Sequence, residues 1–139
     1  LCTYNGARFL PAQLDSVLVQ SYAPLEIVAV DDHSQDATVE ILESYALRDA
    51  RMRVSVNPEN LGFRRNFERA LTACRGEFIA PCDQDDVWAP SKLARLVAAI
   101  GPRDLAYCDS ELTDATGHPL GRRMSDIWRM GELADPASR

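Results

Sequence analysis

Apolar and polar positions repeat along the chain with two different periods. Short apolar runs rich in β-branched residues predict buried strands, and stretches with apolar residues three or four positions apart predict amphipathic helices. The expected strands cover residues 25–30, 52–56, 77–82 and 105–109, after a first strand that contains the start of the chain. The expected helices cover residues 7–20, 37–47, 64–74 and 91–100.

This order of elements predicts an α/β fold. Strands that alternate with helices are joined by right-handed crossovers, and they form a mainly parallel sheet with helices on both faces. We therefore expect a Rossmann-like three-layer sandwich in a single domain over residues 1–139. The chain opens in an apolar segment at Leu1 without a methionine, so we expect this domain to be incomplete at its start. A turn or hairpin is expected at residues 114–117.

Polar segments follow four consecutive expected strands. They cover residues 3–6, 31–36, 57–66 and 83–86. Ligands of open α/β sheets bind at the carboxyl ends of the strands, so these segments should meet at one edge. Each segment alone is compatible with a helix cap or a surface turn, but four together favour a binding site. Their aromatic, carboxylate, arginine and amide groups suit a nucleotide, because they stack on a base, accept hydrogen bonds and bind phosphate.

The segment "DQDD" places Asp83, Asp85 and Asp86 within four positions after an apolar run. Like charges this close repel one another unless solvent, protons or a cation relieve them. A calcium loop of the EF-hand type is excluded, because Trp88 and Ala94 stand where it needs glycine and glutamate. Two interpretations remain: acids exposed in a loop, or Mg²⁺ or Mn²⁺ held by one or two carboxylates and the phosphates of a ligand.

Composition and charge narrow the class of protein. With 46% hydrophobic and 26% charged residues, the chain has an ordinary globular balance. It contains no apolar run near the roughly 18 residues of a membrane span. The net charge of −6 argues against binding to nucleic acid phosphates. The four cysteines lack the short spacing of a zinc site, so we expect reduced thiols and a cytoplasmic compartment.

Five segments in this order, "CTYNG", "VAVDDHSQDAT", "ENLGFRRNFERAL", "RGEFIAPCDQDDVW" and "LAYCD", resemble the family 2 glycosyltransferases, which have the GT-A fold. The resemblance extends to about Gly121, and "DQDDVW" is similar to the branch with bacterial rhamnosyltransferases and other enzymes of polysaccharide synthesis. It implies inverting, metal-assisted transfer of a sugar from a nucleoside diphosphate sugar to a hydroxyl of a glycan or lipid-linked acceptor. It also implies a domain truncated on its C-terminal side, in a parent protein that is cytoplasmic or peripheral at the inner face of the membrane. An unpaired sheet edge in such a truncated domain would favour homo-oligomers.

The resemblance also assigns roles to individual residues. The nucleotide-binding residues would be Cys2, Thr3, Tyr4, Asp32, Arg65 and Asp83. Asp85 is the first choice for a direct metal ligand, with Asp83 beside it, and Asp86 and Trp88 would face the sugar or acceptor. Arg64 is an alternative to Arg65. No acid after the "DQDD" segment has a recognisable base motif, so we expect the catalytic base beyond Arg139, and donor binding without efficient transfer by this chain.

Two other functions are compatible with parts of the sequence. One is a non-catalytic module that binds a nucleotide sugar. The other is a signalling receiver domain, in which "VDDHS" would bind Mg²⁺ and Asp83 would accept a phosphoryl group. A receiver also needs a lysine after a late strand, whereas the one lysine of this sequence, Lys92, stands in an expected helix.

Overall fold

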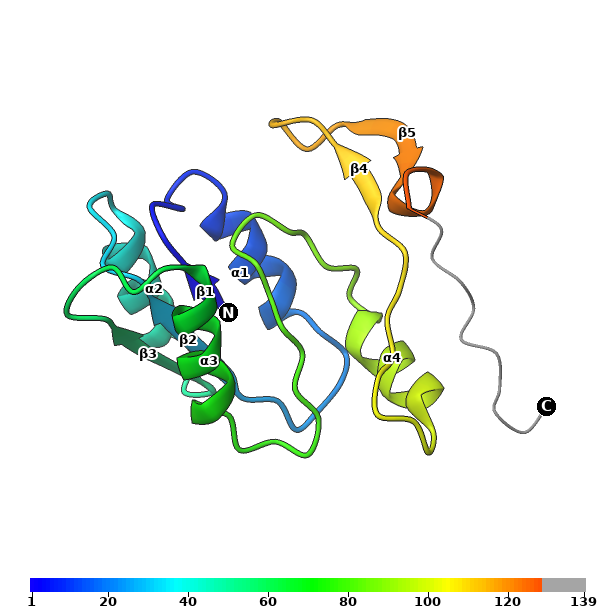
Figure 1. Cartoon of the computed structure of the whole chain (residues 1–139), viewed down its shortest axis with the longest axis horizontal. Helices are drawn as coiled ribbons and strands as arrows, with labels where there is room; N and C mark the ends of the chain where they lie inside the picture. Colours follow the sequence, from blue (N-terminus) through cyan, green and yellow to red (C-terminus); the bar gives the residue numbers. More distant parts are fainter. Residues whose placement is uncertain (129–139) are drawn as a thin grey trace. The chain divides into compact units, whose positions relative to one another are not determined.

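Strand β2 (Ile27–Asp31) is the centre of a three-stranded parallel sheet. Strand β1 (Cys2–Thr3) pairs with one side of it and strand β3 (Met52–Val56) with the other (Figure 1). The register pairs Thr3 with Asp31 and Asp31 with Val56, so the three strands end at the same level. The expected parallel α/β sheet is confirmed.

The computed structural model describes residues 1–128. These fall into two compact units, Leu1–Gly101 and a second unit that begins at Pro102. All four expected helices are confirmed, with ends shifted by at most three residues. They are α1 (Leu10–Leu18), α2 (Thr38–Ala46), α3 (Phe63–Ala73) and α4 (Lys92–Ile100). Within this described part of the chain, no helix is long and apolar enough to cross a membrane.

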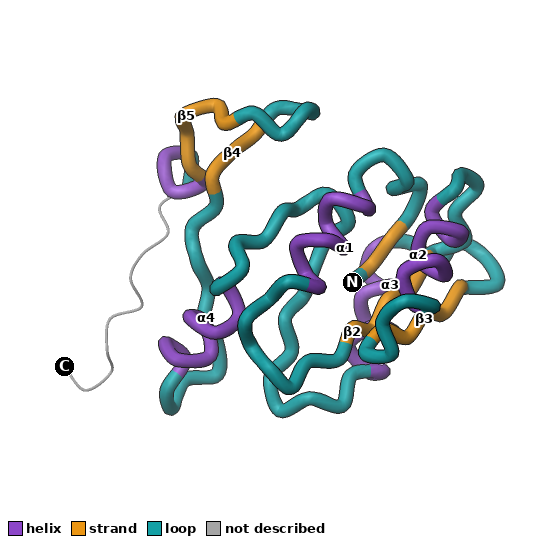
Figure 2. The backbone as a smooth tube through the Cα atoms, turned by 180° about the vertical axis from the view of Figure 1, so that it is seen from behind, coloured by secondary structure: helices purple, strands orange, loops and turns teal. Residues whose placement is uncertain are grey.

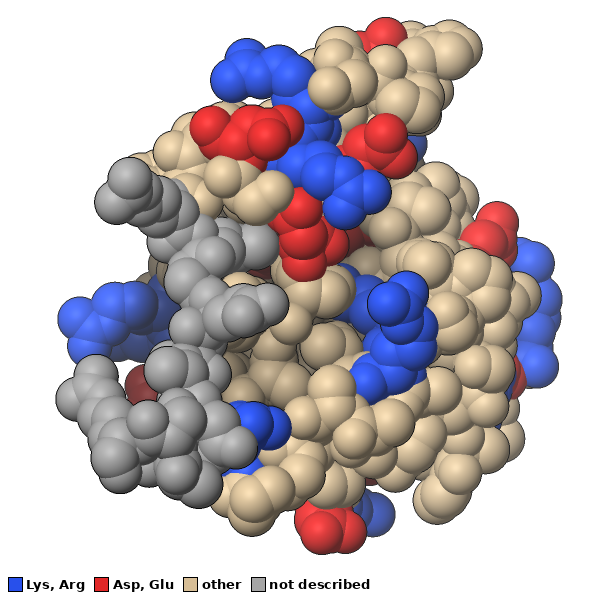
Figure 3. Space-filling model, turned by 90° about the vertical axis from the view of Figure 1, so that its right-hand side faces the viewer, with Lys and Arg blue, Asp and Glu red and all other residues tan. Residues whose placement is uncertain are grey.

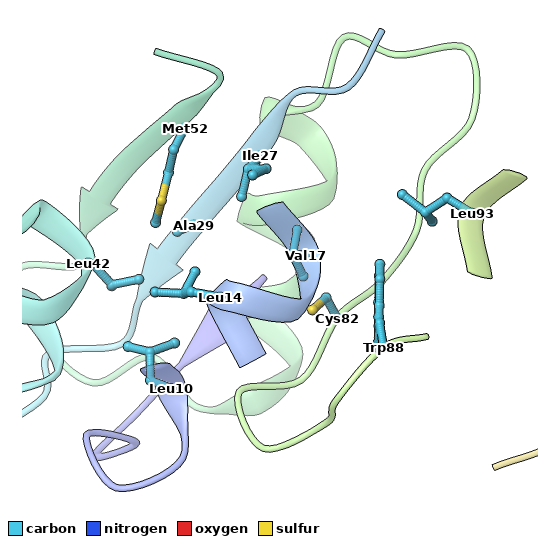
Figure 4. Packing of buried hydrophobic residues seen from close by; sticks show 10 residues of the cluster. All are labelled: Leu10, Leu14, Val17, Ile27, Ala29, Leu42, Met52, Cys82, Trp88 and Leu93. Carbon is cyan, nitrogen blue, oxygen red and sulfur yellow. The ribbon is translucent and has the colours of Figure 1, made fainter. Parts of the chain in front are cut away.

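Helices cover both faces of the sheet because successive side chains of a strand point to opposite sides. On one face, Ile27 and Ala29 pack with α1, α2 and β3. On the other face, Val28 and Val30 pack against Ala70 of α3. Every residue of β2 is buried, as in a strand that is covered on both sides. The unit therefore has the expected three layers, with the larger part of its core on the α1 and α2 face (Figure 4).

Two of the expected strands are wrong. Residues 77–82 contain no strand, and they belong to the long loop between α3 and α4 (Figure 2). This segment makes one backbone hydrogen bond to β1, from Cys2 N to Cys82 O (3.2 Å), and no ladder forms between them. Residues 105–109 are largely exposed and contain no strand. Apolar composition alone therefore overestimated the width of the sheet in this part of the chain.

The second unit contains a small antiparallel hairpin of β4 (Glu111–Thr113) and β5 (Pro119–Arg123), followed by a short 3₁₀ helix, η1 (Met124–Asp126). Its turn is closed by hydrogen bonds from Asp114 N to His118 O (2.9 Å) and from Gly117 N to Asp114 O (3.0 Å). Gly117 has a φ of +85°, a conformation that glycine adopts without strain. The expected hairpin at residues 114–117 is confirmed.

The position of Leu14 in the core predicts a large effect on stability. Leu14 is fully buried among residues of α1, α2 and β2, so Leu14→Ala should lower the free energy of unfolding by about 2–5 kcal/mol through lost contacts and a cavity. Leu47→Ala is the matched control, because Leu47 is 89% exposed and its truncation should change stability by less than about 0.5 kcal/mol. Urea unfolding measures both. Equal losses would contradict this description of the core.

Candidate functional site

A buried carboxylate joins the ends of β1 and β2. Asp31 is fully buried, and it accepts hydrogen bonds from Thr3 Oγ1 (2.7 Å), Ser34 N (2.8 Å) and Ser34 Oγ (2.6 Å). Asn5 lies in the loop after β1 and has a left-handed backbone conformation, with a φ of +49°. Asn5 N donates to Ser34 Oγ (2.8 Å), and Asn5 Oδ1 accepts from Gln35 N (2.8 Å). The loops that follow β1 and β2 are therefore held together.

A second carboxylate joins β2 to the loop that follows β3. Asp32 is 2% exposed and accepts from Asn57 Nδ2 (2.7 Å), Leu61 N (2.8 Å) and Gly62 N (2.8 Å). Burial raises the pKa of Asp32, but hydrogen bonds from Leu61, Asn57 and Gly62 outweigh it and leave the pKa below its ordinary value. Asp32 therefore remains ionised, and it orders the segment that enters α3.

The acidic loop, defined as residues 83–86, is attached to the same edge. Gln13 of α1 donates from Nε2 to Asp83 O (2.9 Å). Gln84 contacts the loop after β1: its Oε1 accepts from Tyr4 N (2.8 Å) and its Nε2 donates to Tyr4 O (3.1 Å). The expectation that four polar segments meet at one edge of the sheet is confirmed by these contacts.

A hollow of about 150 Å³ lies where these segments meet. It is lined by Cys2, Thr3, Tyr4, Phe63, Asn66, Phe67, Asp83, Gln84 and Asp85. Tyr4 and Phe63 are 47% and 72% exposed, so both aromatic rings are accessible to a ligand. The hollow thus combines accessible aromatic groups with two carboxylates.

Five of the residues that we expected to bind the nucleotide or metal line this hollow: Cys2, Thr3, Tyr4, Asp83 and Asp85. Four lining residues were missed as site residues: Phe63, Asn66, Phe67 and Gln84. Phe67 has helical spacing with Ala70 and Cys74, so the sequence favours a role in packing for it. Gln84 stands between two acids, but its amide can both donate and accept a hydrogen bond, and this property is the signal for a role at the site.

The other expected site residues lie outside the lining of the hollow. Asp32 is buried, while Arg64, Arg65 and Asp86 are exposed to solvent. Trp88 requires a correction. We expected it to face the sugar or acceptor, but it is 5% exposed and packs in the core with Cys82 and Leu93 (Figure 4). An indole is a large apolar group, and here its burial holds the loop after residue 86 against α1.

The charges around the hollow favour a cation over a reactive thiol. Partial burial raises the pKa of Asp83, and repulsion from Asp86 and Asp85 raises it further. A bound cation would relieve that repulsion. Burial raises the pKa of Cys2 to about 11, so its thiol is neutral and offers neither a nucleophile nor a thiolate ligand. Across residues 1–128, no three His, Cys, Asp or Glu side chains converge as a metal site.

Comparison with known proteins gives one family. The glycosyl transferase family 2 model matches residues 1–131. An uncharacterized glycosyltransferase of Haemophilus influenzae is 31% identical over 104 residues, which are 75% of this chain and 32% of that protein. TuaG of Bacillus subtilis, a putative teichuronic acid biosynthesis glycosyltransferase, is 33% identical over 105 residues, which are 76% of this chain and 42% of that protein. The chain spans less than half the length of these relatives.

Solved structures of glycosyltransferases share the fold. A structure of S. aureus TarS 1–349 in complex with UDP has a TM-score of 0.64 and 26% identity, with 81% of this chain and 40% of that chain covered. The mannosyltransferase PcManGT from Pyrobaculum calidifontis, in complex with GDP-Man and Mn²⁺, has a TM-score of 0.67 and 27% identity, with 81% and 33% covered. The expected GT-A fold is confirmed. Because the family model covers nearly the whole sequence, the chain belongs to glycosyl transferase family 2.

Proposed function

We propose that this chain is the donor-binding part of an inverting glycosyltransferase. The enzyme would transfer a sugar from a nucleoside diphosphate sugar to a hydroxyl of a glycan or lipid-linked acceptor in polysaccharide synthesis. The observation that carries the proposal is the hollow in which Tyr4 and Phe63 lie with Asp83 and Asp85. Further support comes from relatives: TuaG is named for teichuronic acid biosynthesis, and PcManGT was solved with GDP-Man and Mn²⁺.

The aromatic part of the hollow suits the nucleobase. Tyr4 and Phe63 expose ring surface on which a base can stack, and Cys2 and Thr3 supply the end of β1 as one wall. The volume of about 150 Å³ is below the roughly 300–1,000 Å³ of a pocket for a drug-sized ligand. We therefore assign the base and the adjoining ribose to this hollow, and the sugar to the surface outside it.

The acidic part suits a divalent cation. Asp83 and Asp85 would hold Mg²⁺ or Mn²⁺, hard ions that prefer oxygen ligands and commonly take only one or two carboxylates together with phosphates. When bound, such an ion neutralises negative charge on a departing diphosphate. Two observations support this assignment: Asp83 and Asp85 both line the hollow, and partial burial together with neighbouring negative charge raises the pKa of Asp83.

Two acids of the second unit, Asp109 and Asp126, are poorly suited to act as the general base. Asp109 accepts hydrogen bonds from Ser125 Oγ (2.8 Å) and Ser125 N (3.1 Å). Those bonds lower its pKa, and a carboxylate with a low pKa is a weak proton acceptor. Asp126 accepts from Arg123 N (2.7 Å). We therefore propose that the base lies beyond Arg139 in the whole protein.

We also propose a cytoplasmic location, on the basis of the cysteines. The four cysteines all lie in the described part of the chain and are unpaired there, which supports a reducing cytoplasm.

On the face that Figure 3 shows, basic side chains lie among acidic ones. This mixture and the net charge of −6 support our proposal that nucleic acid is not a partner.

Calorimetric titration tests the cation and the nucleotide together. UDP, dTDP and GDP are titrated into the chain with and without Mn²⁺, and we expect Mn²⁺ to strengthen binding of the preferred nucleotide by about tenfold or more. Asp85→Ala should lose this gain, because it removes a cation ligand. Asp104→Ala is the matched control, since Asp104 is exposed and distant in sequence. Metal-independent binding of equal strength by the chain and by Asp85→Ala would contradict the assignment of Asp85.

The raised pKa of Asp83 predicts that Asp83→Asn has opposite effects on the Tm with and without the cation. The folded protein holds the Asp83 proton more tightly than the unfolded chain, so ionisation of this group destabilises the fold as pH rises through its folded pKa. Asp83→Asn should therefore keep or raise the Tm without metal at neutral pH. With Mn²⁺ and nucleotide, the unsubstituted chain should gain more Tm than the variant, and this gain should shrink as pH falls and Asp83 is protonated. Thermal unfolding at several pH values measures the Tm of both proteins with and without Mn²⁺ and nucleotide. An equal gain in Tm for the two proteins that does not change with pH would refute the prediction.

A transfer assay tests the position of the base. The purified chain should bind a nucleoside diphosphate sugar yet transfer its sugar slowly or not at all, because Asp109 and Asp126 are held by hydrogen bonds within the second unit. Release of UDP from UDP-GlcNAc or GDP from GDP-mannose, with a glycan acceptor, is the measurement. Efficient transfer by residues 1–139 alone would show that the base lies within this chain.

A further inference from the structure

We propose that Gln84 is a positioning residue, which sets the acidic loop and the loop after β1 in one arrangement. The inference rests on the proposed function, because it concerns the two halves of the donor site. One half holds the cation ligands Asp83 and Asp85, and the other half holds the aromatic ring of Tyr4. Gln84 is the side chain that connects them.

The connection is a reciprocal pair of hydrogen bonds across 80 residues of sequence. Tyr4 N donates to Gln84 Oε1 (2.8 Å), and Gln84 Nε2 donates to Tyr4 O (3.1 Å). The amide of Gln84 thus pairs with the backbone of Tyr4 as a residue of a neighbouring strand would. A glutamine can do this because its amide carries both a donor and an acceptor, which glutamate at neutral pH and methionine lack. Since its amide is directed to Tyr4, Gln84 acts on the ligand through its neighbours.

The same Gln84 amide also packs closely against Gly6. A Cβ placed on Gly6 would lie 2.2 Å from Gln84 Oε1 and 2.5 Å from Gln84 Cδ. Gly6 does not have the left-handed backbone of Gly62 or Gly117, so its conformation does not demand glycine. A side chain at position 6 would instead displace the Gln84 amide from its present place. The segment "TYNG" therefore ends in glycine to admit a side chain of the acidic loop.

The acidic loop is also held from its other side. Gln13 of α1 donates from Nε2 to Asp83 O (2.9 Å), so the backbone beside Gln84 is fixed to the helix. Gln84 then fixes the same loop to Tyr4, and both Gln84 and Tyr4 line the hollow together with Asp83 and Asp85. Because the Gln84 amide holds the acidic loop against Tyr4, a ligand that contacts both halves should bind more weakly when this amide is lost.

Three variants test the role of Gln84. Gln84→Met keeps the length of the side chain and removes both hydrogen bonds. Gly6→Ala leaves Gln84 unchanged but takes the space of its amide. Each should weaken binding of the nucleotide preferred among UDP, dTDP and GDP, in the presence of Mn²⁺, by about tenfold. The double variant should bind no more weakly than either single one, because both break the same contact.

Glu43→Gln is the control, since Glu43 is exposed in α2 and lies outside the lining of the hollow. It should bind nucleotide as the unsubstituted chain does. Hydrogen exchange at the Tyr4 amide gives a readout that needs no ligand: it should accelerate in Gln84→Met and Gly6→Ala but not in Glu43→Gln.

The outcomes separate this inference from the proposed function. If the unsubstituted chain binds a nucleotide and the two variants bind it equally well, the positioning role is wrong and the proposed function stands, even where their Tm is lower. Additive losses in the double variant would also overturn the shared contact. If the unsubstituted chain binds none of the three nucleotides, the proposed function fails. Faster exchange at Tyr4 would then leave Gln84 with a structural role alone and would overturn positioning.

Discussion

The parallel pairing of β1, β2 and β3 is the constraint on which the candidate site depends. Their register ends Thr3, Asp31 and Val56 at one level, so the three following loops start from one edge. Parallel neighbours require helical crossovers, and these place α1 and α2 on one face and α3 on the other. The site is therefore assembled from segments that are distant in sequence, and side chains rather than a wider sheet connect them.

Aspartates serve two opposite purposes at this edge. Asp31 and Asp32 are buried, and each accepts several hydrogen bonds from the neighbouring loops. For Asp32 these bonds outweigh burial and lower the pKa. Asp83 instead receives no such compensation from donors, and burial and its acidic neighbours raise its pKa. The first pair stabilises the structure, whereas Asp83 and Asp85 are available for a ligand with positive charge.

The acidic loop is held in the site although no strand precedes it. Residues 77–82 share a single backbone hydrogen bond with β1. Two side-chain amides position the acidic loop after them. Gln13 of α1 donates a hydrogen bond to the loop, and Gln84 of the loop bonds to the backbone of Tyr4. Buried Trp88 then packs the following residues into the core. This is why a loop rich in like charges keeps a defined place beside Tyr4.

The sequence by itself determined the order of the elements, the helices and the polar segments at the strand ends, because these depend on local periodicity and composition. It also indicated Tyr4, Asp83 and Asp85 as neighbours in one site, although the segment before Asp83 that led to this expectation is not a strand. Only the tertiary structure decided that residues 77–82 and 105–109 form no strand, because pairing depends on contacts with distant segments. It also decided that Trp88 is buried and that Gln84 bonds to Tyr4. Whether a side chain faces solvent, core or another loop depends on contacts between distant residues, and no local pattern contains that information.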